Sequence, residues 1–367
     1  MSKAAELAAL IGGTSGSSLS NRNLIINGAM QVAQRSTSLT VGDSTEYKTL
    51  DRFAIAINGT TAGRATMSQA TDAPNGFGNS MKFDVTTADT SIGASEAFGF
   101  AQRIEGQNLQ QLAKGTADAK VSTLSFYAKG TAKTYIVEVR DANSRQVSAT
   151  FDVTTSWQRF EIEIPADTTG TIANDNSTEL QILWWLHAGS DYTSGTLNTS
   201  WATSTNANRM VGCDSIFDST SNELLITGIQ LEVGEQATPF EHRSYGDELL
   251  ACMRYYQQIG GELSNVLCTG QCTSSTLAQF WIPFIVPVRD DPTCSVSDQT
   301  HFRVFNAAVS GIPDTTNMTI AATNAASHGG FRIQATVGSG LVAGNATMLS
   351  GSDSDSNAGI IKMDAEL

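Results

Sequence analysis

Apolar and polar side chains alternate over much of this chain, which is the pattern of half-buried β-strands. In the clearest run, every second residue points to one side of the predicted strand: Leu225, Thr227, Ile229, Leu231 and Val233. Gly228, Gln230 and Glu232 point to the other side. We therefore predict a strand with one buried face over residues 225–233.

Further alternating runs lie at 53–57, 81–85, 124–128, 135–139 and 160–164. Turn-rich segments such as DAPNGFGNS separate them. One run, LQILWWL at 180–186, is apolar at nearly every position, which indicates a strand covered on both faces. Short strands joined by such turns predict an all-β protein whose main body is a jelly-roll β-sandwich.

The pattern changes after Pro239, which cannot donate to a strand ladder. Ser244 and Asp247 form a capping-box pattern. Behind them apolar residues recur at helical spacing: Leu249, Leu250, Met253 and Tyr256. A Gly-Gly pair at 260–261 would end this helix, so we predict a short helix over 245–258.

The patterns divide the chain into four segments: an N-terminal attachment helix and Gly/Ser linker at 1–20, the jelly roll at 21–243, a collar helix at 244–261 and a smaller C-terminal β tip domain at 262–367. Leu7 and Ile11 lie on one apolar stripe of the N-terminal helix. A helix this short is marginal in water. It is therefore either a frayed terminus or a peg that packs against a partner.

The chain carries a net charge of −14 and has a pI near 4.6. No stripe of Lys and Arg interrupts this acidity, so we expect no nucleic-acid partner. The apolar runs are too short for a signal peptide or a bilayer span, so we expect no membrane insertion. The five cysteines have irregular spacing and are expected to be free thiols, as in a protein assembled in a reducing cytoplasm.

Residues that could carry catalysis form no recognisable motif. None of the four histidines lies in a triad context: His187, His242, His301 and His328. The sequence contains no phosphate-binding loop with its lysine and no EF-hand or zinc spacing. We predict that the protein is not an enzyme, with no catalytic residues, no metal and no cofactor.

Aromatic residues gather between Trp184 and Trp201. Neighbours on a strand face opposite sides, so Trp184 and Trp185 cannot both enter one core. Trp185, Tyr192 and Trp201 are the candidate ligand-binding residues, because sugars bind aromatic rings that have hydroxyl and amide groups beside them. The alternative, which the frequent use of Trp as a packing anchor favours, is that these rings fix a long loop to its own sheet or to a neighbouring subunit.

Four stretches resemble a family of virion proteins of marine tailed phages: NRNLIINGAMQVAQRSTS at 21–38, QRIEGQNLQQLAKGTADAKVSTLSFYAKG at 102–130, AGSDYTSGTLNTSWATSTNANR at 188–209 and ITGIQLEVGEQATPFEHRSYGDELLACMRYYQ at 226–257. The terminal DAEL also matches. The resemblance is weaker over the last hundred residues. Members of this family are described as tail fibre or virion structural proteins with a body similar to a carbohydrate-binding-module jelly roll.

The resemblance implies a homotrimeric tail fibre subunit of the virion, assembled in the host cytoplasm. Its N-terminus would join other tail proteins, such as an adaptor or nozzle, and its distal end would bind host cell-surface polysaccharide. The resemblance implies no catalytic residues. Two other interpretations stay open: a capsid decoration or head fibre protein with the same fold, and a polysaccharide depolymerase.

The apolar stripe of the collar helix predicts the contact between subunits, with Leu249, Met253 and Tyr256 as its seam and Leu7 and Ile11 as a second contact. Replacing both Leu249 and Met253 by Asp should dissociate the trimer, because carboxylates would meet in an apolar interface. Sedimentation velocity of the double variant measures this. An intact trimer would refute the seam.

Overall fold

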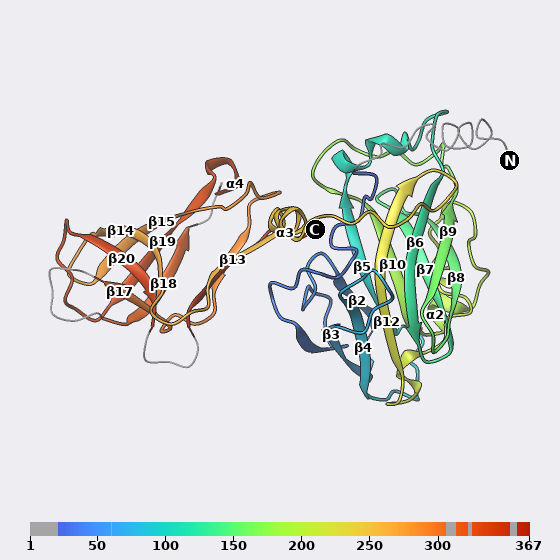
Figure 1. The fold of residues 1–367 in the computed structure, drawn as a ribbon, viewed down its shortest axis with the longest axis horizontal. Helices are drawn as coiled ribbons and strands as arrows, with labels where there is room; N and C mark the ends of the chain where they lie inside the picture. The colour runs from blue at the N-terminus through green and yellow to red at the C-terminus, as the bar shows by residue number, and fades with distance from the viewer. Residues whose placement is uncertain (1–20, 60, 306–312, 322–324, 353–357) are drawn as a thin grey trace. The chain divides into compact units, whose positions relative to one another are not determined.

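A computed structural model describes residues 21–59, 61–305, 313–321, 325–352 and 358–367. The predicted N-terminal helix, with Leu7 and Ile11, lies outside the described residues. The chain divides into two compact units, Met1–Glu248 with Leu367 and Leu249–Glu366 (Figure 1). Both units are built from antiparallel sheets, which confirms the all-β class.

The first unit is a sandwich of two six-stranded sheets (Figure 1). Sheet A has the order β1 (Ser38–Val41), β3 (Arg64–Ala70), β4 (Ser80–Thr87), β12 (Glu223–Val233), β6 (Ser122–Gly130) and β9 (Gln158–Ile164). Sheet B has the order β11 (Ala202–Thr203), β8 (Arg145–Val153), β7 (Lys133–Asp141), β10 (Thr178–Ala188), β5 (Ala97–Glu105) and β2 (Ala54–Asn58). The chain crosses between the sheets after β1, β2, β4, β5, β6, β8, β9 and β11, as the predicted jelly roll requires.

Short helical turns lie in the connections of this unit: η1 (Gly106–Asn108), η2 (Gln110–Leu112), α2 (Ser190–Thr193), η3 (Asn206–Asn208) and η4 (Ile216–Asp218). Within the described residues, no helix of either unit is long and apolar enough to span a bilayer.

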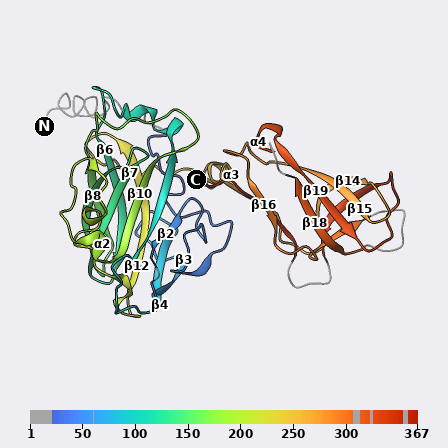
Figure 2. The same cartoon turned by 180° about the vertical axis from the view of Figure 1, so that it is seen from behind.

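Strand β10 is covered on both faces, as its sequence predicts. Trp184 faces the space between the sheets and stacks on Phe100, with ring centroids 4.9 Å apart. Leu183 and Trp185 face outward into a second, smaller core that includes Tyr192. The connection that carries α2 supplies this cover and runs beside β7 and β8 in both views (Figures 1 and 2).

Strand β12 departs from the predicted alternation in its first half. Leu224 and Ile226, not Leu225, face the main core. A register shift against β6 follows Thr227, and Gly228 there has a φ of +65°. This bulge turns the strand by one residue, so that the predicted positions from 229 to 233 face the core. The predicted face was therefore correct only after the bulge.

The helix α3 (Tyr245–Met253) is shorter than predicted. The Asp247 backbone N–H donates to Ser244 Oγ over 3.1 Å, so the predicted cap is present. Tyr256, however, begins strand β13 (Tyr256–Gly260) and is buried. The prediction that Tyr256 belongs to a helical seam is wrong, because its backbone pairs with strand β21.

The second unit contains a three-stranded and a six-stranded sheet. Sheet C has the order β13, β21 (Ile360–Asp364) and β16 (Thr293–Val296). Sheet D has the order β17 (Phe302–Phe305), β20 (Ala346–Gly351), β14 (Val266–Cys272), β15 (Leu277–Pro283), β19 (Gly330–Val337) and β18 (Thr315–Ala321), and α4 (Ala325–His328) precedes β19. Side chains from both sheets share one core, which includes Phe280, Ile333 and Met363.

The five cysteines are free, as their spacing predicts. Burial raises the pKa of Cys268 to about 12. Burial, reinforced by Asp291, raises the pKa of Cys294 to about 12 as well. Both thiols are therefore protonated at neutral pH and poor nucleophiles.

The bulge in β12 predicts a strong dependence on Gly228. A Cβ atom at this position would lie 2.7 Å from Phe77 and 2.9 Å from Tyr127, on a backbone that L-residues rarely adopt. Gly228→Ala should lower the free energy of unfolding by about 2–4 kcal/mol. Gly78→Ala is the control, because its Cβ would meet nothing within 4 Å. Urea denaturation of both variants measures the difference, and equal stabilities would contradict this account of the bulge.

Candidate functional site

The structure buries two of the three predicted ligand-binding aromatics. Trp185 donates its Nε1–H to Glu138 Oε2 over 2.7 Å, and the Arg209 guanidinium lies 5.3 Å from the Trp185 ring centre. Tyr192 is buried and hydrogen-bonds to the side chain of Asn58. Neither ring presents a face to a ligand. The prediction of a sugar platform is therefore wrong for Trp185 and Tyr192, which anchor the connection after β10 to sheet B.

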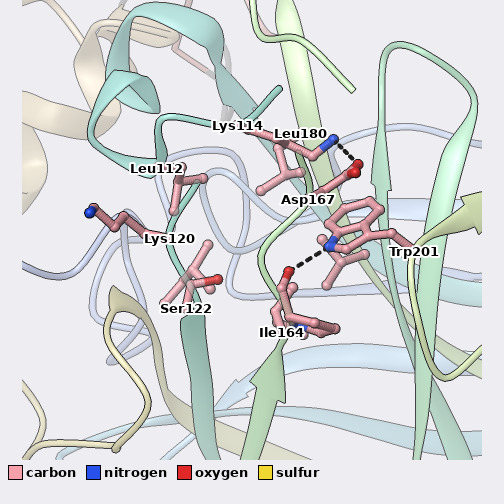
Figure 3. A pocket seen from close by; sticks show the side chains of 11 residues that line it. Leu112, Lys114, Lys120, Ser122, Ile164, Asp167, Leu180 and Trp201 are labelled. Carbon is pink, nitrogen blue, oxygen red and sulfur yellow. Dashed lines mark hydrogen bonds and ion pairs between the residues drawn. The ribbon is translucent and has the colours of Figure 1, made fainter. Parts of the chain in front are cut away.

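Trp201 lines a pocket in the first unit, together with Lys114 and Asp167 (Figure 3). The indole donates its Nε1–H to the Pro165 carbonyl over 2.7 Å. Lys114 Nζ lies 4.3 Å from the centre of the Trp201 ring, a cation–π contact. The pocket has a volume of about 330 Å³ including open solvent, and apolar side chains form much of its lining: Leu112, Val139, Ile164, Leu180 and Leu231.

The charged groups beside Trp201 neutralise one another. Lys114 Nζ bonds to Asp141 and, over 2.8 Å, to Asp167 Oδ2. Arg145 Nε donates to the same Asp167 oxygen over 2.7 Å. Burial raises the pKa of Asp167, but hydrogen bonds from Arg145 and Lys114 outweigh burial and hold it well below its usual range. The two cations and two carboxylates satisfy each other, so this network fits a structural role better than ligand recognition.

The structure also assembles a buried set around His187. Its Nδ1 lies 2.7 Å from Ser215 Oγ, and its Nε2 lies 3.3 Å from Glu96 Oε2. Burial lowers the pKa of His187, and the carboxylate of Glu96 beside it only partly offsets this effect. The lowered pKa keeps the ring neutral near pH 7. Ser215 is also buried, and its Oγ accepts the Phe217 N–H as the cap of η4. These contacts describe a packed core histidine rather than an accessible nucleophile.

The site that sequence reasoning missed lies on the open face of sheet D. Trp281 is 50% exposed although it sits on β15, an interior strand of this sheet. Its indole rests close to the backbone of Gly330, because a Cβ atom added there would lie 3.0 Å from Trp281 Cε2. An aromatic ring supported by backbone on one side and open to solvent is a surface for stacking.

Amide side chains lie in a row beside this tryptophan. Gln271, Gln279 and Gln334 are successive Cα partners on β14, β15 and β19, and Thr319 on β18 continues the row. These side chains are exposed or partly exposed, and within the described residues they make no hydrogen bond to protein. Each amide can donate and accept at once, which suits a ligand rich in hydroxyl groups.

The sequence contained a signal for this face. In LAQFWIP the apolar residues Ala278, Phe280 and Ile282 occupy alternate positions and enter the core. The same alternation turns Gln279 and Trp281 to the opposite face. The alternation in the sequence therefore predicts a tryptophan on the outward face of this strand.

No family model matches the sequence, and no curated protein matches it. One similar solved structure is a putative sugar binding protein from Bacteroides thetaiotaomicron, with 12% identity and a TM-score of 0.33 over 58% of this chain and 100% of that chain. Another is TmCBM61 in complex with β-1,4-galactotriose, with 13% identity and a TM-score of 0.29 over 58% of this chain and 100% of that chain. Likenesses at these scores carry no weight for what this chain binds.

The enzymatically active domain of tailspike protein 4 from bacteriophage CBA120 is also similar, with 13% identity and a TM-score of 0.31. The match covers 58% of this chain and 22% of the tailspike chain. This chain therefore corresponds to less than a quarter of that protein, and the likeness is again too weak to transfer a role.

The Lys114 network predicts a pH-dependent stability. Because the pKa of folded Asp167 lies below its unfolded value, its contribution is complete above about pH 4 and is lost as the pH falls further. Asp167→Asn should cost about 3–5 kcal/mol at pH 7 and lose less additional stability than the wild type between pH 5 and pH 3. Asp118→Asn, in an exposed loop, is the control. Urea denaturation at each pH tests this, and parallel pH profiles would contradict it.

Proposed function

We propose that this protein is a non-enzymatic virion component that attaches to its host by binding cell-surface glycans through the Trp281 face. The observation that carries this proposal is the half-exposed Trp281 on an interior strand of sheet D. Beside it lies a row of glutamines whose side chains make no hydrogen bond to protein among the described residues. The sugar would stack a ring face on the indole while its hydroxyl groups bond to the amides.

The geometry favours this face over the jelly-roll pocket. The polar groups around Trp201 already bond to each other or to backbone. Those of the Trp281 face are open, and a ligand would not need to break protein contacts to reach them. Binding energy is larger when the recognising groups require little rearrangement.

The resemblance of residues 21–257 to phage virion proteins supports a role in the virion. In this role the protein is a homotrimeric tail fibre subunit, its N-terminal segment joins other tail proteins, and the second unit contacts the host. Assembly takes place in the host cytoplasm, which agrees with five free cysteines. Glu161, a carboxylate on the outer face of sheet A, is paired with Arg159 at 2.9 Å.

Trp281→Ala should reduce binding to host surface polysaccharide by at least about tenfold, because the stacking surface is removed. Trp281→Phe should retain part of the affinity, since it keeps an aromatic ring. Trp157→Ala is the matched control, a partly exposed tryptophan of the first unit. Retention of the purified protein on immobilised polysaccharide measures all three variants.

The same incubation distinguishes binding from degradation. Retention without release of reducing ends supports attachment, and release of reducing ends would identify a depolymerase instead. Undiminished retention of the Trp281→Ala variant would refute the proposed face.

A further inference from the structure

Arg332 lies on sheet D and takes no part in the function proposed above. It is exposed on β19 and is the Cα partner of Trp281 on β15, so both side chains leave the sheet on the same face. Within the described residues, Arg332 makes no ion pair and no hydrogen bond. A guanidinium carries five N–H donors in a planar fork, and here all of them are available to a ligand.

The strands of sheet D bring no carboxylate beside Arg332. None of the six strands of sheet D, within their bounds, contains Asp or Glu. The other arginine of the sheet, Arg303, donates to Asp314 over 2.8 Å. Among the strand residues of this face, Arg332 is therefore a positive charge without a carboxylate partner, in a chain whose net charge is −14. Such an exception to the prevailing charge is the expected recognition element for an anionic ligand.

We propose that the Trp281 face binds acidic glycans, and specifically a sugar ring whose carboxylate pairs with Arg332. This inference rests on the proposed function and narrows its ligand class. Trp281 and Arg332 occupy adjacent strands, which lie about 5 Å apart. A ring stacked on the indole thereby brings a ring carboxylate within reach of the guanidinium, which binds such groups through two parallel N–H···O bonds.

The two rows of the face divide the recognition between them. Trp281 and Arg332 take the ring and its charge, and they form the row nearer Gly330. Gln279 and Gln334 lie two residues further along the same strands, about 7 Å away, and take the hydroxyl groups of the same or the next sugar. A chain of sugars rather than a single residue fits this extended arrangement.

The test compares acidic oligosaccharides with their own carboxyl-reduced forms. The probes are oligogalacturonate, oligoglucuronate and oligomannuronate, each titrated into the full-length protein by calorimetry beside its neutral counterpart. The wild type should bind at least one acidic probe at least about tenfold more tightly than its neutral form, because a charge-assisted bidentate contact is lost on reduction.

Variants separate charge from stacking. Arg332→Gln should lower affinity for the acidic probe by about tenfold or more and change affinity for the neutral form by less than about twofold. The affinity of Arg332→Lys for the acidic probe should lie between those of the wild type and Arg332→Gln, since Lys keeps the charge but not the planar fork. Lys362→Gln removes one positive charge from sheet C of the same unit and should have no effect.

The outcomes distinguish this inference from the proposed function. Equal binding of acidic and neutral forms, or no loss in Arg332→Gln, overturns the acidic ligand and leaves glycan binding intact. Failure of the wild type to bind any glycan, host polysaccharide included, overturns both. Sedimentation velocity of Trp281→Ala and Arg332→Gln completes the test. A change of oligomeric state in these variants would show that a second copy covers the face, which also overturns the inference.

Discussion

Strand β12 is buried on both faces, and the jelly roll depends on the hydrogen bonds that the polar side chains of one face receive. Gln230 and Glu232 are almost completely inaccessible, yet neither faces an apolar core. Glu232 accepts hydrogen bonds from the backbone and the hydroxyl of Thr238, and Gln230 accepts one from the Glu241 N–H. Asn23 completes the cover by accepting from the backbone of the same strand. A buried carboxylate without such partners would cost several kcal/mol.

This constraint brings together the two ends of the first unit. The segment around Asn23 begins the described chain, and residues 238–241 follow the last strand of the sandwich. Residues 238–241 bond to the polar side chains of β12, the segment at Asn23 bonds to the backbone of the same strand, and the Asn23 N–H also donates to Glu241. The bulge at Gly228 turns that face toward them, since without it Gln230 and Glu232 would point into the main core. Backbone geometry at one glycine therefore decides which residues close the sandwich.

The two units use their aromatic residues differently. In the first unit Trp184, Trp185 and Tyr192 are buried, and Trp201 supports a charge network through Lys114. In the second unit Trp281 makes no hydrogen bond or aromatic contact among the described residues, and its ring lies against Gly330. A ring that contributes little to packing while exposing apolar surface has a cost in solubility. That cost is the reason an exposed tryptophan in an otherwise polar face suggests recognition.

Period-2 patterning determined the fold class, most strand positions and the doubly covered β10, because a residue's side of a strand follows from its place in the sequence. The helix cap at Ser244 was also predicted correctly, because it depends only on residues 244–247. Only the tertiary structure decided the bulge in β12 and the change from helix to strand at Tyr256, since each depends on pairing with distant strands. Burial of Trp185 and Tyr192 depended on a connection folding back over sheet B, which no local pattern encodes. The row of glutamines beside Trp281 likewise arises from register between strands far apart in the chain, and register is a property of the folded sheet.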